Sequence, residues 1–376
     1  MSVDWAQVRR QFPALEHWTY LNTATYGQLP LCAQQAIRDH LERRDELACT
    51  DFLTWFDDAD RIRASVARLI HCQADDIAFV HNASVSISLL IGGIDWRPGD
   101  RLVTLPHEFP NNIYYPALLA SRGAEFVETP WERFYEAITP QTRLVALSTV
   151  NYTHGFRPPL AEISRFLRQR GVLFYVDGTQ SLGALEFDVR EVQPDLLAVD
   201  AYKWLLGPNG SGFMYVAPSL RERLAPSVIG WRSHRDWRNV DNLHHGAPEF
   251  SHAAEKYEGG MLVFPSLYAM GASVEMILDL GPAAIEARVM ELAGKLRALL
   301  RGLGAALPSD VSPHFDSPIV AARFEGIDAS QLARELKQQR VVISARHGYL
   351  RISTHFYNDE EDLARLETEL RSLQGG

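Results

Sequence analysis

The chain has 376 residues, 46% of them hydrophobic and 22% charged, a composition and length that suit one large soluble domain plus a smaller one. Its formal net charge of −10 disfavours nucleic acid or an anionic membrane surface as the main partner. No apolar run approaches a membrane span, the N-terminus lacks a signal-peptide core, and three cysteines do not suggest a disulfide framework. We therefore expect a cytoplasmic protein.

Strand-like and helix-like patterns alternate from the N-terminus onward. We expect a short helix and an arm over 1–20, a brief strand and polar turn at 20–30, and helices over 31–70. Further strands are predicted to begin at 76, 100, 124 and 143, with helices ending at 94 and covering 160–170. Because strands that alternate with helices pair in parallel beneath two helical layers, the sequence predicts an α/β fold.

Residues 172–216 contain three apolar runs that we predict to be buried strands. The first ends at Asp177, and the second ends at Asp200, three residues before Lys203. A turn at 207–212 precedes the third run. Asp177 and Lys203 thus fall at strand ends, where α/β sheets tend to bind ligands. Their spacing alone favours an ion pair, with a lysine that forms an imine as the other interpretation.

The pattern is weaker after residue 216 and becomes regular again near residue 281. Residues 226–264 lack a clear period and are predicted to be loops near a site or an interface. Apolar residues then recur every three or four positions from Ile285 to Leu303, which predicts a helix. Strands at 318–324, 341–344 and 349–354, a helix at 329–338 and a last helix from Asn358 complete a second α/β unit.

The segments VDGTQSLG and AYKWLLGP, which contain Asp177 and Lys203, resemble the class V aminotransferase family of fold-type I enzymes. This family includes cysteine desulfurases, kynureninase and isopenicillin N epimerase. The resemblance implies pyridoxal phosphate (PLP) as cofactor and a homodimer with its site at the subunit interface. It also implies a large PLP-binding domain over 21–264, with a mostly parallel sheet between helices. A small domain would combine 1–20 with 265–376.

The resemblance assigns cofactor roles to several of these residues. Lys203 matches the lysine that forms the internal aldimine, a Schiff base, and later carries the α-proton. Asp177 matches the acid beside the pyridine nitrogen, and Gln180 the side chain that binds the ring 3-oxygen. Phe109 occupies the position of a stacking ring, and Asn151 lies near a cofactor-facing asparagine of the family.

A phosphate-binding turn is expected at HNAS (81–84), between a strand and a helix. The backbone of Ala83 and Ser84 and the Ser84 hydroxyl match the family's phosphate contacts, and a helix N-cap is the structural alternative. Tyr202 resembles the kynureninase tyrosine, whose hydroxyl reaches the phosphate. Asp200 replaces a family serine, and its carboxylate would repel the phosphate.

Arginine is the residue best suited to grip the α-carboxylate of an amino acid. The segment YLRISTHFYNDEEDL matches the C-terminal signature of the family, which makes Arg351 the expected contact. Asn22 is a second candidate and Arg346 a weaker one. His244, His245 and His252 lack metal-ligand spacing, so no metal site is expected.

The resemblance specifies the cofactor better than the reaction. The segment before Arg351 lacks the cysteine that desulfurases use there, so we expect no cysteine-persulfide mechanism. Transamination of a small amino acid is the leading prediction, and a β-lyase or epimerase is the alternative. An inactive scaffold is disfavoured because Lys203, Asp177 and Arg351 are all present. Met261 stands where many relatives place a threonine that contacts the phosphate of the other subunit.

Overall fold

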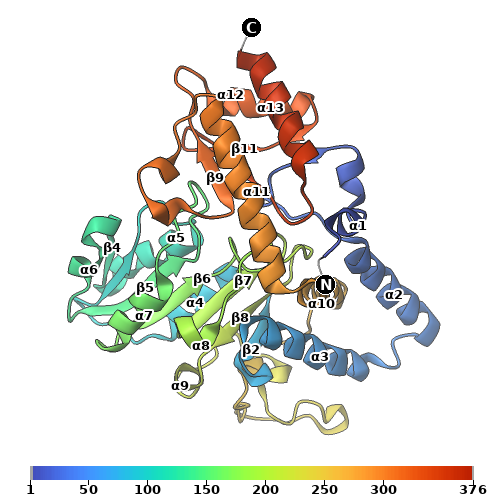
Figure 1. Ribbon diagram of the computed structural model, residues 1–376. Helices are drawn as coiled ribbons and strands as arrows, with labels where there is room; N and C mark the ends of the chain where they lie inside the picture. The colour runs from blue at the N-terminus through green and yellow to red at the C-terminus, as the bar shows by residue number, and fades with distance from the viewer. Residues whose placement is uncertain (1–2, 375–376) are drawn as a thin grey trace.

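The protein is described here by a computed structural model of residues 3–374, in which a seven-stranded sheet lies below a smaller α/β unit (Figure 1). The strand order is β2-β8-β7-β6-β5-β3-β4. The strands are β2 (Ile77–Val80), β3 (Arg101–Thr104), β4 (Glu125–Glu128), β5 (Thr142–Ser148), β6 (Leu173–Asp177), β7 (Leu196–Asp200) and β8 (Gly212–Val216). Strands β3 to β7 are parallel, and β8 is antiparallel to both neighbours because a turn, not a crossover helix, precedes it. The mostly parallel α/β fold is confirmed.

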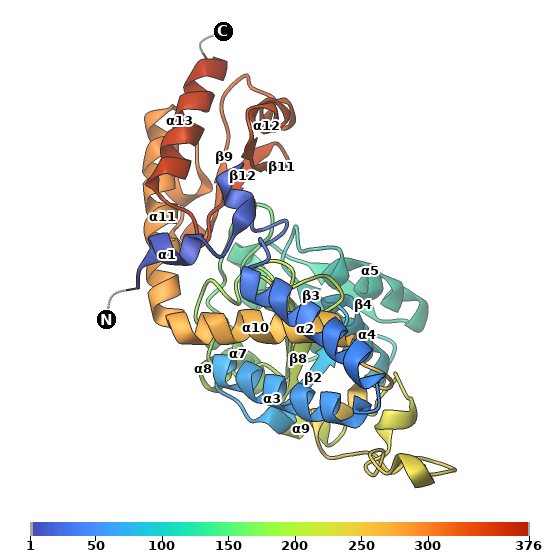
Figure 2. The same ribbon diagram turned by 90° about the vertical axis from the view of Figure 1, so that its right-hand side faces the viewer.

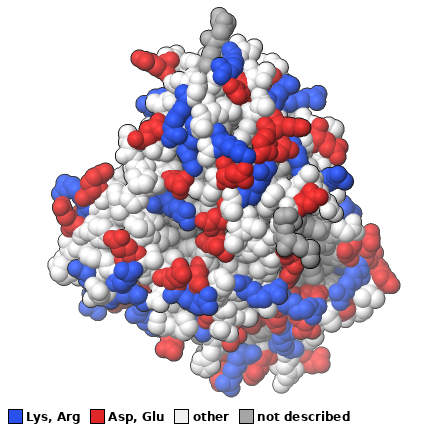
Figure 3. Space-filling view, viewed as in Figure 1, with Lys and Arg blue, Asp and Glu red and all other residues white. Residues whose placement is uncertain are grey.

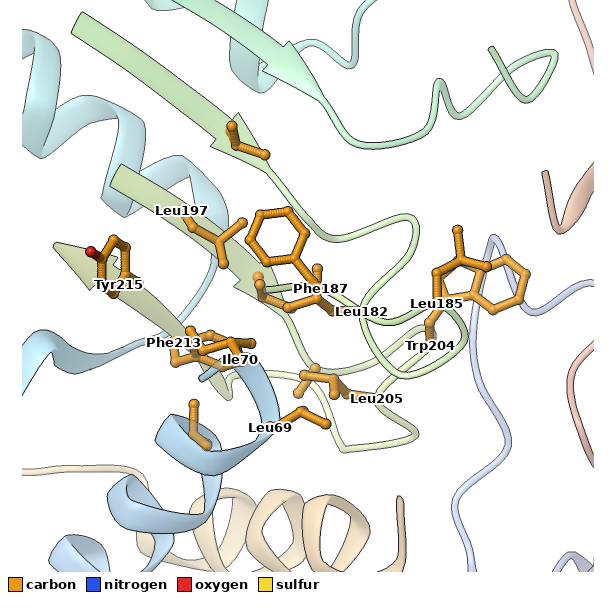
Figure 4. Packing of buried hydrophobic residues seen from close by; sticks show 14 of the residues in the cluster. Leu69, Ile70, Leu182, Leu185, Phe187, Leu197, Trp204, Leu205, Phe213 and Tyr215 are labelled. Carbon is orange, nitrogen blue, oxygen red and sulfur yellow. The ribbon is translucent and has the colours of Figure 1, made fainter. Parts of the chain in front are cut away.

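Alternate residues of the central strands pack on opposite faces of the sheet. Leu197 and Val199 of β7 join the core beneath α3 (Phe52–Ile70), α7 (Leu160–Arg168) and α10 (Phe264–Leu280), whereas Leu196 and Ala198 face α4 (Ala83–Gly93) and α9 (Pro218–Arg221). Figure 4 shows Leu69 and Ile70 of α3 in the same cluster as Leu197 and Phe213. This double burial explains why the strands are apolar throughout, and it fixes where their polar ends emerge.

Several predicted boundaries needed correction. The helical stretch from residue 31 is two helices, α2 (Leu31–Leu47) and α3, separated by left-handed residues at Ala48 and Cys49. Two helices, α5 (Asn111–Leu118) and α10, were not predicted at all. Helix α10 is buried on most of its surface, so its sequence carries no apolar–polar period.

The C-terminal unit contains a three-stranded antiparallel sheet of β11 (Ser344–Arg346), β12 (Tyr349–Ser353) and β9 (Ile319–Ala322). It packs with α11 (Pro282–Gly302), α12 (Ala329–Gln338) and α13 (Glu360–Gln374) around one core. The strand predicted at 341–344 is two strands, β10 (Val341–Val342) and β11. The last helix begins at Glu360 rather than Asn358, because the Asp359 carboxylate accepts a hydrogen bond from the Asp362 N–H.

The N-terminal segment lies against this C-terminal unit. Strand β1 (Thr19–Tyr20) pairs with β10, and Arg9 of α1 (Trp5–Arg9) forms a 2.8 Å salt bridge with Asp362. Helices α10 and α11 run in nearly perpendicular directions in Figure 2, and α11 carries the chain from the large sheet to the small one. The division into 21–264 and 1–20 with 265–376 stays a prediction. Two short helices, α6 (Phe134–Ala137) and α8 (Val189–Val192), complete the set.

In the described part of the chain, 3–374, we find no helix with both the length and the apolar character needed to cross a membrane.

Candidate functional site

The carboxyl ends of β6 and β7 bring two carboxylates and a lysine together. Asp177 ends β6, Asp200 ends β7, and Lys203 follows in the loop to β8; all three are at most 6% exposed. The Lys203 amine lies 5.1 Å from the centroid of the Phe109 ring and 5.3 Å from that of Tyr202. Among residues 3–374, Lys203 forms no salt bridge with an acid, so the ion pair favoured by spacing alone is not formed.

Burial changes the acid–base properties of this group. It lowers the pKa of Lys203 to about 8, against the opposing charges of Asp177 and Asp200. Burial also raises the pKa of Asp177, opposed by hydrogen bonds from Thr179, whose N–H is 3.0 Å from Oδ1. A lysine with a pKa near 8 holds a substantial neutral fraction close to neutral pH, as an amine that accepts protons requires.

The loop that carries Lys203 is held by Gly27 of the N-terminal segment and by Gln180. The Gly27 N–H donates to the Tyr202 carbonyl at 2.8 Å, and a Cβ on Gly27 would lie 1.9 Å from the Lys203 carbonyl oxygen, so no larger residue fits. The Trp204 indole donates to Gln180 Oε1 at 3.0 Å, and the Gln180 amide donates to the Ala24 carbonyl at 3.1 Å. Gln180 therefore lies beside the lysine loop, and both ends of its side-chain amide are hydrogen-bonded, to the Trp204 indole and to the Ala24 carbonyl.

Two aromatic rings form one wall of the site. Phe109, in the loop after β3, packs edge-to-face against Tyr152 with centroids 5.2 Å apart. Tyr152 lies in the loop after β5, and its carbonyl accepts a hydrogen bond from Arg351. Asn151, the preceding residue, uses its amide within these loops: it donates to the His107 carbonyl at 2.8 Å and accepts from the Thr153 N–H at 2.9 Å.

The first turn of α4 lies next to Asp200. The Ala83 N–H donates to Asp200 Oδ1 at 2.7 Å, and the Ser84 hydroxyl donates to Asn111 Oδ1 at 2.7 Å. Burial and the charge of Asp177 raise the pKa of Asp200 to about 6. Asp200 thus accepts the hydrogen bond of the Ala83 N–H, which the resemblance assigns to a phosphate. Tyr202 packs against Tyr26, with ring centroids 5.1 Å apart.

Arg351 reaches the site from β12 and is 1% exposed. Its Nε donates to Ser344 Oγ at 3.0 Å, Nη1 to the Tyr152 carbonyl at 2.7 Å, and Nη2 to Thr25 Oγ1 at 2.5 Å. Burial and the charge of Arg346 lower the pKa of Arg351 to about 9. Asn22 joins the same network, because its Oδ1 accepts a hydrogen bond from the Thr25 hydroxyl at 2.8 Å.

Three residues connect these parts, and the sequence pointed to only one of them, Tyr152, which follows Asn151 in a loop near a cofactor-facing asparagine of the family. Thr25 links Arg351 to Asn22, Tyr152 links Arg351 to Phe109, and His355 donates through Nε2 to the Trp204 carbonyl at 2.9 Å. His355 lies inside the C-terminal segment that matches the family and Thr25 does not, and contacts across more than a hundred residues leave no local period. Thr25 and His355 are identified only by their contacts in the folded structure, with Arg351 and with Trp204 next to Lys203.

The residues present suit PLP. A buried carboxylate at a strand end can face a pyridine nitrogen, the Lys203 amine can reach a carbonyl carbon, and the Phe109 ring can cover an aromatic ring. The backbone N–H groups at the start of α4 can donate to a phosphate. The Ala83 N–H can do so only if its hydrogen bond to Asp200 is broken. Within residues 3–374, no group of three or more His, Cys, Asp or Glu side chains is arranged to hold a metal ion.

The chain is similar over nearly its whole length to known proteins. The profile of the family described as "Aminotransferase class-V" matches residues 53–366. A probable cysteine desulfurase of Methanothermobacter thermautotrophicus is 26% identical, with 98% of each chain covered. Isopenicillin N epimerase of Streptomyces clavuligerus is 30% identical, with 99% of each chain covered. A solved C-DES variant with glycine covalently linked to its PLP cofactor has a TM-score of 0.87 at 23% identity, covering 96% of this chain and 98% of that one.

Proposed function

Because the chain belongs to the class V aminotransferase family, whose members use pyridoxal phosphate, we propose that it transaminates a small amino acid with Lys203 as its proton carrier. The family resemblance that the segments around Asp177 and Lys203 suggested is confirmed, and PLP is the cofactor. The reaction and the roles of individual residues are our proposal, and the geometry of the site supports them as follows.

The observation that carries the proposal is the incomplete set of partners around Arg351. A guanidinium has five N–H donors, and three of them are used, one by each nitrogen. One N–H on each Nη remains, and a carboxylate can accept hydrogen bonds from both Nη atoms of an arginine. Arg351 is 1% exposed and forms no salt bridge within residues 3–374, so a substrate α-carboxylate would supply the missing anion.

The other residues of the site have separate proposed roles around Arg351. Bound PLP supplies an electron sink that acidifies the α-hydrogen of the substrate. Arg351, with Asn22 behind Thr25, orients the substrate by its carboxylate, and Lys203 Nζ removes the α-proton and returns it. Asp177 would hold a proton at the ring nitrogen, while Phe109 excludes water from one face. Tyr202, Gln180 and the Ala83–Ser84 turn are the proposed supports of the cofactor's oxygens, with Asn151 beside them.

Transamination fits a site with a single amine base. It requires one group that moves a proton between neighbouring carbons, and Lys203, with a pKa of about 8, can accept and donate at neutral pH. Epimerisation requires in addition a proton delivered to the opposite face of the substrate; it stays an alternative because one relative is an isopenicillin N epimerase. A β-lyase acting on a sulfur amino acid is another alternative, because one relative is a probable cysteine desulfurase.

The three cysteines give a protein-bound persulfide little support. Cys32 lies in α2, Cys49 between α2 and α3, and Cys72 after α3, and none belongs to a loop that carries Lys203 or Arg351. Burial raises the pKa of Cys72 to about 12, which keeps that thiol protonated.

We also infer a homodimer. Val228, Ile229, Met261 and Val263 are exposed apolar residues, between 40% and 59% accessible, in the segment whose sequence predicted an interface loop. Val228, Met261 and Val263 line a cavity of about 130 Å³ that also includes His81, next to the start of α4. Burying such side chains against a second copy would remove apolar surface from water close to the proposed phosphate turn.

The proposal can be tested on protein loaded with PLP. A panel of amino acids is added without a keto acid, and the visible spectrum and the products are followed. Formation of pyridoxamine phosphate and one equivalent of keto acid supports transamination. Pyruvate with ammonia or sulfide would indicate a lyase, and racemised amino acid alone an epimerase; either outcome replaces the proposed reaction.

Lys203→Ala tests the role of the lysine, and Lys337→Ala, an exposed lysine of α12, is the matched control. Lys203→Ala should remove the visible band of the lysine-bound cofactor and all turnover, whereas Lys337→Ala should keep both. A wild-type protein that stays colourless with PLP would refute the assignment altogether.

A further inference from the structure

One face of the small antiparallel sheet carries arginines without acidic partners. Strand alternation puts Arg346 on the same face as Ser344, and Ser344 pairs with Arg351 across β11 and β12. Arg323, just after β9, lies over the Tyr349 ring on this face, with 4.4 Å from its guanidinium carbon to the ring centroid. None of these three arginines forms a salt bridge among residues 3–374, although most other arginines of the chain do.

Histidines from three loops meet at the edge of this face. His347 is the first residue of the two-residue turn between β11 and β12, and its φ of 49° together with 79° at Gly348 suits a type I′ hairpin. Its ring centroid lies 5.6 Å from that of His107, which follows β3, and His107 lies 6.3 Å from His154. Imidazoles at these separations can all direct N–H donors toward one small group.

Tyr152 connects this cluster to the reacting lysine. Its hydroxyl is 3.3 Å from His347 Nε2, its carbonyl accepts from Arg351, and its ring packs against Phe109 beside Lys203. Burial is the main cause of the lowered pKa values of Lys203 and Arg351, and the positive charge of Arg346 adds to both. Contacts therefore run from Lys203, through Phe109 and Tyr152, to His347, the residue that follows Arg346.

There is a local excess of positive charge and N–H donors in a chain of net charge −10. On the face shown in Figure 3, acidic and basic side chains are intermixed, so an arginine group without acids is a local feature. The α-carboxylate of a substrate needs only the two free N–H groups of Arg351. Arg346 donates to the neighbouring Ala345 carbonyl at 2.8 Å and has no anionic partner among residues 3–374.

We propose that the substrate is an amino acid with a second carboxylate at the end of its side chain, bound by Arg346 and by the imidazoles of His107 and His347. The inference rests on the proposed function and names its substrate class. A planar carboxylate matches the guanidinium fork and accepts further bonds from imidazole N–H groups. Arg323 adds favourable charge at the entrance without touching the substrate.

Open space lies beside the histidine cluster. A cavity of about 510 Å³ is lined by His107 and His154, and also by Trp131, Glu108 and Glu132. Glu108 does not compete for the arginines, because it accepts hydrogen bonds from the Ser148 N–H at 2.9 Å and from Asn112 Nδ2 at 3.0 Å. Burial raises the pKa of Glu108, which further reduces its negative charge.

The test compares acidic amino acids with their neutral isosteres on PLP-loaded protein. Single-turnover rates of the spectral change are measured for aspartate against asparagine and for glutamate against glutamine, with alanine as the short reference. We expect one acid to exceed its amide at least about tenfold in rate over apparent Kd. Arg346→Gln should lower the rate for that acid at least about tenfold more than the rate for alanine.

Arg334→Gln is the control, since Arg334 is exposed on α12 away from this face. His347→Asn should reduce the acid-to-amide ratio in the same direction, by less than the arginine variant. Equal or faster reaction of the neutral amino acids, with a ratio that Arg346→Gln leaves unchanged, would overturn the proposal.

A binding experiment tests the second carboxylate site independently of the proposed reaction. Glutarate and butyrate, which lack an amino group, are titrated into the PLP-loaded protein by calorimetry. Arg346-dependent preference for glutarate supports a second anion site even if no amino acid reacts. Equal binding of the two acids counts against that site even if transamination is observed.

Discussion

His355 Nε2 lies 2.9 Å from the carbonyl oxygen of Trp204, so a residue just past β12 holds the residue that follows Lys203. The other ring nitrogen, Nδ1, accepts the Phe356 N–H at 2.8 Å, which leaves Nε2 as the donor. His355 is completely buried, and burial lowers its pKa to about 4. The strand that carries Arg351 and the loop that carries Lys203 are thereby fastened together.

Replacing His355 should destabilise the protein and loosen its lysine loop. His355→Ala leaves the buried Trp204 carbonyl unpaired and opens a cavity, so the free energy of unfolding should fall by about 2–4 kcal/mol. Urea unfolding of the PLP-free protein measures this loss, with His17→Ala, an exposed histidine, as control. A stability equal to that of wild type would show that the hydrogen bond has no structural role.

The same histidine predicts a dependence of stability on pH. The pKa of His355 is about 4 in the folded chain and about 6.5 when unfolded, so the unfolded chain binds the extra proton between these values. Stability should therefore be complete above pH 6.5 and decrease by about 1.4 kcal/mol per pH unit from this group as the pH falls toward 4. Urea midpoints at pH 7, 6 and 5 test the sign, and a flat profile would contradict it.

Capture of the cofactor should depend on the neutral amine of Lys203. Because burial lowers its pKa to about 8, the neutral fraction increases between pH 7 and pH 9. The initial rate of appearance of the visible band after PLP is mixed with apo-protein should rise across this range, half-maximal near pH 8. A midpoint near 10.5, the value of a free lysine, would show that the amine is solvated.

Asp200 should weaken the binding of the phosphate. Its carboxylate, bonded to the Ala83 N–H, has a pKa of about 6 and is mostly ionised at pH 7.5. Asp200→Asn keeps an acceptor for Ala83 but removes the charge, so the affinity for PLP should increase by about tenfold. Equilibrium titration of apo-protein with PLP gives the two dissociation constants. Weaker binding in the variant would instead assign Asp200 a role in holding the cofactor.

Binding of the substrate carboxylate should require the bidentate geometry of Arg351 as well as its positive charge. Arg351→Lys retains a cation but not the two parallel N–H groups, and Arg351→Gln loses both. We expect rate over apparent Kd for reactive amino acids to fall by about a hundredfold or more in each, with PLP binding kept. Spectral titration with PLP and single-turnover kinetics separate the two effects. A lysine variant with nearly full activity would rule out bidentate binding.

Helices show clearly how far sequence patterns reach. Helix α11 was predicted because one face is buried and the other is exposed to solvent, so apolar residues recur every three or four positions. Helix α10 was missed because it is buried on most sides and has no period. The start of α13 was misplaced by two residues because both Asn358 and Asp359 suit a cap, and only the fold directs the Asn358 side chain to the His355 N–H.

The sequence by itself determined the α/β class and the family, because strand periodicity and the segments around Asp177 and Lys203 are local features of the chain. It also singled out Lys203, Asp177 and Arg351 as residues of one site. Tertiary structure alone decided that Asp200 accepts the Ala83 N–H, that Arg351 keeps two donors free, and that His347 lies near His107. These depend on contacts between residues up to 326 positions apart, whose distances follow from the packing of the two sheets and leave no period in the sequence.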